Sequence, residues 1–167
     1  MKYEEAIKIA NDKLEQLRPH CERIQIAGSL LRKCKTVGDI EIVAIPKPYE
    51  TGMFASGIVK VCDQWKCVKG NFHNEKSKKT RYTQRILPEG IKLDLFLCDP
   101  VNWGYILAIR TGSAEFSKKL SQTWKRKGFY GKDGYLHRSV TDKLIPVHEE
   151  IDLFKLIGIE YVKPEDR

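Results

Sequence analysis

The spacing of apolar residues predicts a helix and two strands near the start of the chain. Apolar side chains recur at helical intervals over Tyr3–Leu17, as in a helix that packs one face on a core. Two short runs rich in β-branched residues, Arg23–Ala27 and Asp39–Ile45, predict buried strands. Gly28 ends the first strand, and Leu30–Cys34 is expected to form a turn of helix whose free N–H groups suit phosphate.

The middle of the chain has the partial alternation of polar and apolar residues that is typical of an antiparallel meander. We expect its strands over Gly57–Cys62, Trp65–Gly70 and Lys79–Leu87. A nearly continuous apolar strand is expected to follow over Ile91–Cys98. The stretch 69–85 carries six basic residues and one acidic residue. Such a charged edge either guards the sheet against aggregation or contacts phosphate groups, and the sequence leaves both interpretations open.

After Pro100 a helical pattern replaces the strand pattern. Thr111–Ser113 interrupts the helix, and Ser113 has the chemistry of an N-cap for the helix that follows. The remaining expected elements are a helix end at Gly128, a hairpin over Phe129–Leu136, a short helix over Glu149–Ile157 closed by Gly158, and a polar, tail-like end over Glu160–Arg167.

Three acidic side chains fall on the predicted strands and point to metal chemistry. Because side chains alternate along a strand, Asp39 and Glu41 project to one face while Ile40 and Ile42 project to the other. Asp94 interrupts a run of buried-type residues, where an isolated carboxylate needs a partner or a metal ion. If the two strands are neighbours, the three carboxylates form one cluster, and such a cluster can hold two divalent ions.

The composition narrows the classes of partner. The chain has 167 residues and a formal net charge of +8, with 30 Lys and Arg against 22 Asp and Glu. This length can bury one sizeable core. The excess of positive charge favours nucleic acid, nucleotide or an anionic membrane surface as partner. The segment 110–138 alone has eight basic and two acidic residues, a net charge of +6 in one stretch.

The cysteines and the hydrophobic runs exclude other classes of protein. Five cysteines without a CxxC pair argue against a disulfide framework and against a zinc site, so reduced thiols are expected. No apolar run approaches the ~20 residues that cross a bilayer, and the start of the chain lacks the apolar core of a signal peptide. We therefore expect a soluble, cytoplasmic protein with no membrane partner.

Taken in order, these motifs resemble those of the family X DNA polymerases. The resemblance rests on the ordered set, because a lone Gly-Ser turn is common. It runs from about Arg23 to the C-terminus, and it is closest to the smallest viral members, which keep only palm and thumb. The motifs that carry it are Gly28-Ser29, Arg32, Asp39-Ile40-Glu41, Asp94, Thr111-Gly112-Ser113 and Pro164-Glu165-Asp166-Arg167.

The resemblance implies an α+β fold in two parts and a polymerase activity. A nucleotidyltransferase palm with a mixed or antiparallel sheet and flanking helices would span residues 1–100, and a small α+β thumb would span residues 101–167. Such an enzyme adds a nucleoside monophosphate from an NTP or dNTP to a primer 3′-hydroxyl by two-metal-ion catalysis, in gap-filling DNA repair or in DNA replication. The expected partners are a nucleoside triphosphate and primed or gapped DNA, and the expected state is a monomer.

The resemblance also assigns site residues, position by position. The catalytic residues, which are also the metal ligands for two Mg²⁺ ions or for Mn²⁺ in their place, would be Asp39, Glu41 and Asp94. The residues that contact the nucleotide would be Gly28, Ser29, Arg32, Thr111, Gly112 and Ser113. The residues that contact nucleic acid would be Lys118, Lys119, Lys125 and Arg126.

Departures from the family pattern leave the substrate open. Ile109-Arg110 stands where family members commonly carry an aromatic pair that excludes ribonucleotides, so the choice between dNTP and NTP is open. Ser117 and Ser121 replace an asparagine and an arginine that vertebrate repair members place near the base pair, so fidelity is open as well. Two alternatives stand beside a DNA polymerase. One is a nucleotidyltransferase that acts on an RNA end, a protein or a small molecule, and the other is a non-catalytic nucleic-acid-binding module.

Overall fold

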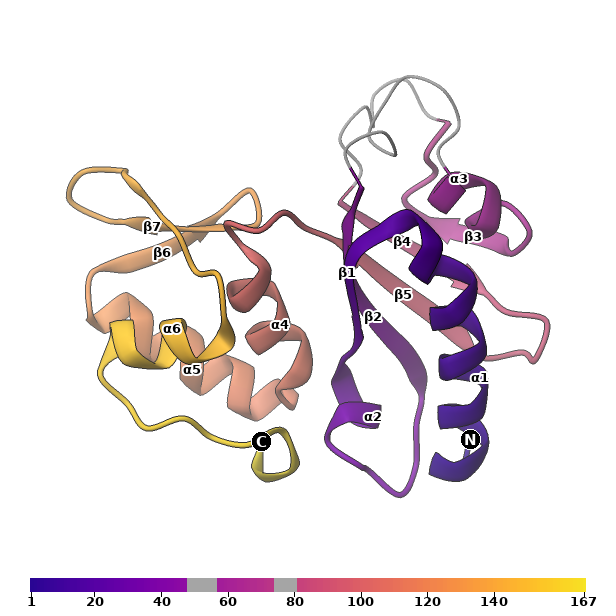
Figure 1. Cartoon of the computed structure of the whole chain (residues 1–167). Coiled ribbons are helices and arrows are strands. Elements are labelled where there is room, and N and C mark those ends of the chain that lie inside the picture. Colours follow the sequence, from indigo (N-terminus) through magenta and orange to yellow (C-terminus); the bar gives the residue numbers. More distant parts are fainter. Residues whose placement is uncertain (48–56, 74–80) are drawn as a thin grey trace.

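The computed structural model describes residues 1–47, 57–73 and 81–167. Its elements form two parts that lie side by side and are joined by the extended segment after β5 (Figure 1). The N-terminal part holds a mixed sheet of five strands, and the C-terminal part holds helices and an antiparallel sheet of three strands. The predicted α+β class is therefore confirmed.

The elements of the N-terminal part follow the predicted order closely, with one exception described below. In chain order they are α1 (Tyr3–Leu17), a 3-10 turn (Arg18–His20), β1 (Cys21–Ile26), α2 (Gly28–Leu31), β2 (Asp39–Pro46), α3 (Gly57–Cys62), β3 (Lys66–Lys69), β4 (Tyr82–Ile86) and β5 (Lys92–Leu97). The first residues of the predicted strand Lys79–Leu87 lie outside the described residues.

The C-terminal part alternates helices with short strands. In chain order its elements are α4 (Trp103–Thr111), α5 (Ala114–Arg126), β6 (Phe129–Lys132), β7 (Tyr135–Arg138), β8 (Leu144–Ile145), α6 (Glu150–Ile157) and a 3-10 turn (Pro164–Asp166).

The five-stranded sheet has the order β1-β2-β5-β4-β3, in which only β2 and β5 run parallel. Helices α1 and α3 cover the face that lies away from the C-terminal part (Figure 1). Ile40, Ile42, Leu93 and Leu95 are fully buried there. Each such side chain contributes about 1.5–3 kcal/mol of burial free energy, which fixes which residues of β2 and β5 point to the other face.

The opposite face of the sheet is only partly covered. Helix α4 packs on it through a second core that includes Val43, Phe96, Trp103 and Leu107. This core joins residues on both sides of position 100, so the predicted domain boundary there stays a prediction. The polar residues at the start of β2 and β5 lie beyond the apolar core that α4 forms.

The segment Gly57–Cys62 was predicted as a strand of the meander, and that prediction is wrong because the segment forms helix α3. Ile58 and Cys62 are both buried in the core beside α1, four residues apart on one helical face. The meander consists of β3, β4 and β5, which pair antiparallel in that order.

Local signals in the C-terminal part are confirmed. The Ser113 hydroxyl caps α5 by accepting a hydrogen bond from the backbone N–H of Phe116, at 3.2 Å. Asp133 and Gly134 both have positive φ, as expected of the tight turn between β6 and β7. Gly158 ends α6 in the left-handed conformation.

The tail-like end predicted over Glu160–Arg167 is wrong, because the last residue is anchored. The Arg167 side chain is fully buried, and its Nη1 donates to Glu150 Oε1 at 2.6 Å. Lys33 also forms an ion pair with Glu165 at 2.8 Å, which ties the C-terminal turn to the N-terminal part. The sequence showed a run of polar residues but not the partners that α6 and the α2 region supply.

Candidate functional site

The parallel pairing of β2 with β5 brings the predicted carboxylates together. In the register of the two strands Glu41 stands opposite Asp94, and Asp39 stands opposite Lys92. Because residues two apart share a face, Asp39, Glu41 and Asp94 lie on the same side of the sheet. The sequence alone did not show that these two strands are neighbours, and the structure shows that they are.

The charges of these side chains repel one another. Burial raises the pKa of Asp39, and the Asp94 charge raises it further. Burial also raises the pKa of Glu41 to about 7, and Asp39 adds to the rise, while the guanidinium groups of Arg110 and Arg32 oppose it. A cation placed among these groups would favour their ionised forms.

Asp94 is the most enclosed of the three carboxylates. It is 8% exposed, and its Oδ1 accepts hydrogen bonds from Tyr82 Oη and Gln84 Nε2, both at 2.8 Å. Burial and the bond to Asp94 raise the pKa of Tyr82 to about 12, so the phenol stays protonated as a donor. Sequence reasoning missed both partners, although Tyr82 and Gln84 share one face of β4.

The donor chemistry of this cluster fits a hard divalent ion, since three carboxylates supply only oxygen ligands. The mutual repulsion of the carboxylates also favours a bound cation, because the positive charge would offset that repulsion. Within the described residues, however, no three His, Cys, Asp or Glu side chains already form a group that could hold a metal ion. The three carboxylates therefore share one face of the sheet without forming such a group.

The first turn of α2 packs directly against the cluster. Gly28 has a φ of +61°, and a Cβ built there would lie 1.8 Å from Glu41 Oε2, so any larger residue would displace the carboxylate. Next to it, the Ser29 hydroxyl oxygen is buried and has no hydrogen-bond partner among the described residues. The helix is shorter than expected, ending at Leu31 rather than Cys34.

Arg32 connects this turn to the C-terminal part. Its Nη1 donates to the backbone carbonyl of Thr111 at 2.7 Å. The charge of the guanidinium also opposes the rise in the pKa of Asp39 and Glu41, so Arg32 lies within electrostatic reach of the cluster. The structure thus brings together Arg32, the carboxylates and the turn that begins at Thr111.

The turn Thr111-Gly112-Ser113 links α4 to α5. Thr111 is fully buried, and its hydroxyl has no partner among the described residues. Gly112 has an ordinary φ of −66°, but a Cβ there would lie 2.6 Å from Ser117 Oγ and 2.7 Å from the Phe116 ring. The glycine is therefore required by a close approach to α5.

The basic residues predicted to contact nucleic acid are exposed on α5. Lys118, Lys119, Lys125 and Arg126 all point to solvent. Lys119 forms an ion pair with Glu115 one turn away, whereas Lys118 and Lys125 stand seven residues apart on one helical face. Such a stripe is a suitable footprint for a polyanion.

A cavity of about 550 Å³ lies between the two parts, beside the cluster. It is lined by residues of β4, β5, α4 and the β6–β7 turn, including Arg81, Tyr82 and Arg110. The Arg110 guanidinium lies 4.1 Å from the centre of the Phe96 ring, and the Tyr82 and Phe96 rings stack with centroids 5.1 Å apart. Arg110, which departs from the family pattern, therefore lies close to the candidate site.

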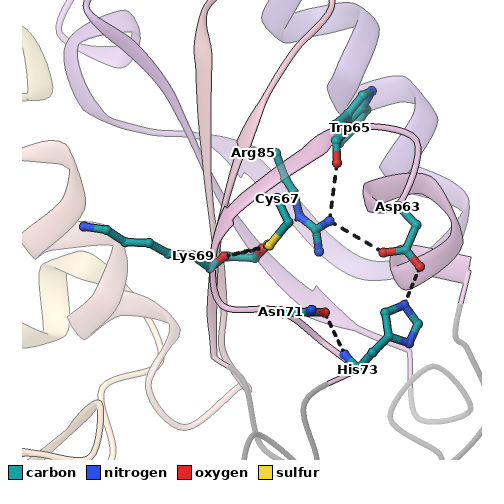
Figure 2. A network of polar contacts seen from close by, with 8 residues as sticks. Asp63, Trp65, Cys67, Lys69, Asn71, His73 and Arg85 are labelled. Atoms are coloured by element: carbon teal, nitrogen blue, oxygen red, sulfur yellow. Dashed lines mark hydrogen bonds and ion pairs between the residues drawn. The ribbon is translucent and has the colours of Figure 1, made fainter.

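Residues 74–80 of the basic stretch 69–85 lie outside the described residues, and in the described part Arg85 points inward (Figure 2). Arg85 is 2% exposed, with Nη1 placed 3.5 Å from Asp63 Oδ1 and donating to the Trp65 carbonyl at 3.4 Å. His73 contacts the same Asp63 at 2.6 Å. These contacts connect β4 to residues on both sides of β3. They lie on the sheet face opposite the carboxylates, so Arg85 has a structural role.

One family model matches the C-terminal part of the chain. Residues 106–167 match the family model of the DNA polymerase beta thumb. The match includes Thr111-Gly112-Ser113, the exposed basic residues of α5 and the anchored C-terminus. It supports a relationship to beta-like family X polymerases. It does not extend over Asp39, Glu41 or Asp94.

No curated protein matches the chain. The described parts of the chain contain no helix that is both long and apolar enough to cross a membrane. The roles of the carboxylates and of the nucleotide-contacting residues stay predictions at this point.

Proposed function

We propose that the chain is a DNA-directed nucleotidyltransferase, which adds a nucleoside monophosphate to the 3′-hydroxyl of a DNA primer and releases pyrophosphate. One observation carries the proposal: β2 and β5 pair in parallel and set Glu41 opposite Asp94 in a chain that ends in a polymerase-like thumb. A carboxylate cluster in the same chain as an element that binds DNA would suit phosphoryl transfer to a polymer end.

Asp39, Glu41 and Asp94 would hold two Mg²⁺ ions, or Mn²⁺ in their place. Bound there, the metal would lower the pKa of the primer hydroxyl and neutralise charge on the leaving pyrophosphate. The chain itself supplies the anionic oxygens on rigid strands. Their repulsion in the free protein, which raises the pKa of Asp39 and Glu41, supports a cationic ligand.

Gly28, Ser29 and Arg32 would bind the triphosphate. The unpaired Ser29 hydroxyl can donate to a phosphate oxygen, and the Arg32 guanidinium would add positive charge where negative charge accumulates. Since Arg32 also holds the Thr111 carbonyl, the phosphate-binding turn and the turn Thr111-Gly112-Ser113 would act on one nucleotide. The exposed lysines and arginine of α5 would contact the DNA backbone.

The acceptor is tested by nucleotide incorporation on a panel of primers with Mg²⁺. We expect a single-nucleotide gap in DNA to be filled, with weaker extension of an unprimed single strand and of an RNA primer. Transfer to RNA ends alone, or to none of the nucleic acids, would contradict the assignment to DNA. Parallel reactions with dNTP and NTP would show which sugar the site with Ile109 and Arg110 accepts.

A second candidate is a DNA-binding module without catalysis. The observation that favours it is that the family match covers residues 106–167 and leaves out Asp39, Glu41 and Asp94. The same panel separates the two functions, because a non-catalytic module would bind gapped DNA but incorporate no nucleotide.

A further inference from the structure

Two neutral donors on β4 hold the Asp94 carboxylate. Tyr82 Oη and Gln84 Nε2 both donate to the same oxygen, Asp94 Oδ1, at 2.8 Å. No ion pair to Asp94 occurs within the described residues, so hydrogen bonds alone orient this carboxylate. Neither donor belongs to the motifs that carry the family resemblance.

The antiparallel pairing of β4 with β5 places both donors on the face that bears Asp94. Gln84 stands directly opposite Asp94, and Tyr82 stands opposite Phe96, which is the diagonal position on the same face. Stacking of the Tyr82 ring on Phe96 fixes the phenol further. Both groups are thus held by regular strands, which makes them suited to fix a rotamer.

The two oxygens of Asp94 differ in their hydrogen bonds, because both bonds from β4 are made to Oδ1. A carboxylate oxygen has two lone pairs in its plane, and Oδ1 uses both for donors on the β4 side. This leaves Oδ2 as the oxygen for a further ligand. Because tyrosine and glutamine are uncharged, they orient the carboxylate without cancelling the charge that a cation needs.

We propose that Tyr82 and Gln84 are positioning residues that hold Asp94 for binding a divalent cation. The inference rests on the proposed function in that the cation is the Mg²⁺ or Mn²⁺ of that site. Partners of this kind usually change metal affinity about 10- to 100-fold when they are removed.

The test is a titration of the full chain with Mn²⁺ alone, followed by the electron paramagnetic resonance signal of the free ion. Tyr82→Phe keeps the stacked ring, and Gln84→Met keeps the length of the side chain. We expect each change to weaken Mn²⁺ binding about tenfold. In primer extension, the Mg²⁺ concentration for half-maximal rate should rise by a similar factor, while kcat at saturating Mg²⁺ and KM for DNA stay near the wild-type values.

Matched variants separate positioning from folding. Tyr161→Phe also loses a hydrogen bond from tyrosine to a carboxylate, that of Glu150, far from the site, and it should leave Mn²⁺ affinity unchanged. In an Asp94→Asn background, Tyr82→Phe and Gln84→Met should have no further effect on Mn²⁺ binding. Thermal melting identifies any variant that fails to fold.

Each outcome decides the inference separately from the proposed function. Wild-type Mn²⁺ affinity in folded Tyr82→Phe/Gln84→Met protein overturns the positioning role, whatever the activity. If the wild-type chain binds Mn²⁺ and loses affinity in these variants but extends no primer, the positioning role stands and the polymerase proposal fails. A wild-type chain that binds no Mn²⁺ overturns both.

Discussion

At the scale of single residues, the carboxylates of the candidate site repel one another. Glu41 is the clearest case, because burial and the Asp39 charge raise its pKa from 4.5 to about 7. The Glu41 carboxyl therefore ionises at a higher pH in the folded chain than in the unfolded chain. Ionised Glu41 therefore destabilises the folded protein when no cation is bound, and the same carboxylate is a proposed ligand for a cation.

Glu41→Gln should make the chain more stable at pH 8 than the wild type, in the absence of divalent ions. Because the pKa is raised on folding, the stabilisation from Glu41 is fully present below about pH 4.5 and is lost as the pH rises through about 7. The full difference corresponds to about 3 kcal/mol. Urea unfolding at pH 4.5 and pH 8 measures it. Glu22→Gln, on an exposed position of β1, is the control, and an equal effect of both changes would contradict the account.

Gly28 provides a second test at this scale. Gly28→Ala places a methyl group at a positive φ and against Glu41 Oε2, so we expect a loss of about 1–3 kcal/mol in unfolding free energy. Gly38→Ala, where a Cβ meets nothing within 4 Å, should change stability by less than about 0.5 kcal/mol. Denaturant unfolding of both variants at one pH makes the comparison. Similar losses at both positions would show that the close approach to Glu41 is not what requires glycine.

At the scale of elements, the sequence predicts those whose signals are local. Helix α1, strands β2 and β5, the Ser113 cap and the β6–β7 turn were all predictable, because period, capping hydroxyl and turn residues act within a few positions. Helix α3 was not predictable in this way. Ile58 and Cys62 are four residues apart, an interval that puts them on one face of a helix and also on one face of a strand.

Ser113→Ala tests the cap of α5. Loss of the hydroxyl leaves the Phe116 N–H without its acceptor, which should cost about 1 kcal/mol of unfolding free energy. Ser113→Asp should retain most of the stability, since aspartate caps helices well. Ser121→Ala, whose hydroxyl bonds to Lys118 O inside the same helix, serves as the control in urea unfolding. A Ser113→Ala protein as stable as the control would remove the cap from the account.

Residues whose partners lie far away in the sequence were the ones that sequence reasoning missed. Tyr82 and Gln84 meet Asp94 only through the β4–β5 register. Arg85 and Arg167 read as surface cations, yet both are buried against acidic partners from other elements. Of the candidate site, the sequence supplied the carboxylates and the glycine turn, while their neighbours depend on tertiary pairing.

At the scale of the whole molecule, ion pairs and hydrogen bonds join the two parts beyond their shared apolar core. Arg23 makes two hydrogen bonds to the Glu149 carboxylate, at 2.6 and 2.8 Å, and its guanidinium lies 4.2 Å from the centre of the Trp103 ring. Arg32 and Lys33 make the other contacts already described. Within the C-terminal part, Arg167 forms a buried ion pair with Glu150 and lies against the Phe154 ring.

Arg167→Met should destabilise the chain by about 3 kcal/mol, because Glu150 is then left buried without its partner. The double change Arg167→Met/Glu150→Gln should cost less than the sum of the two single changes. Arg18→Met, which breaks an exposed ion pair with Glu15, should cost about 0–1 kcal/mol. Thermal or urea unfolding measures all four proteins. A near-neutral Arg167→Met would restore the interpretation of this end as a free tail.

We propose that the carboxylate cluster and the thumb-like residues 106–167 act together on a DNA primer end. The most direct measurement is single-turnover filling of a one-nucleotide gap with Mg²⁺, comparing wild-type chain with Asp94→Asn at equal, verified DNA binding. The account predicts that wild type fills the gap and that Asp94→Asn slows filling at least about 1,000-fold, since a carboxylate that is both metal ligand and charge is lost. Gap filling by Asp94→Asn at the wild-type rate would contradict it.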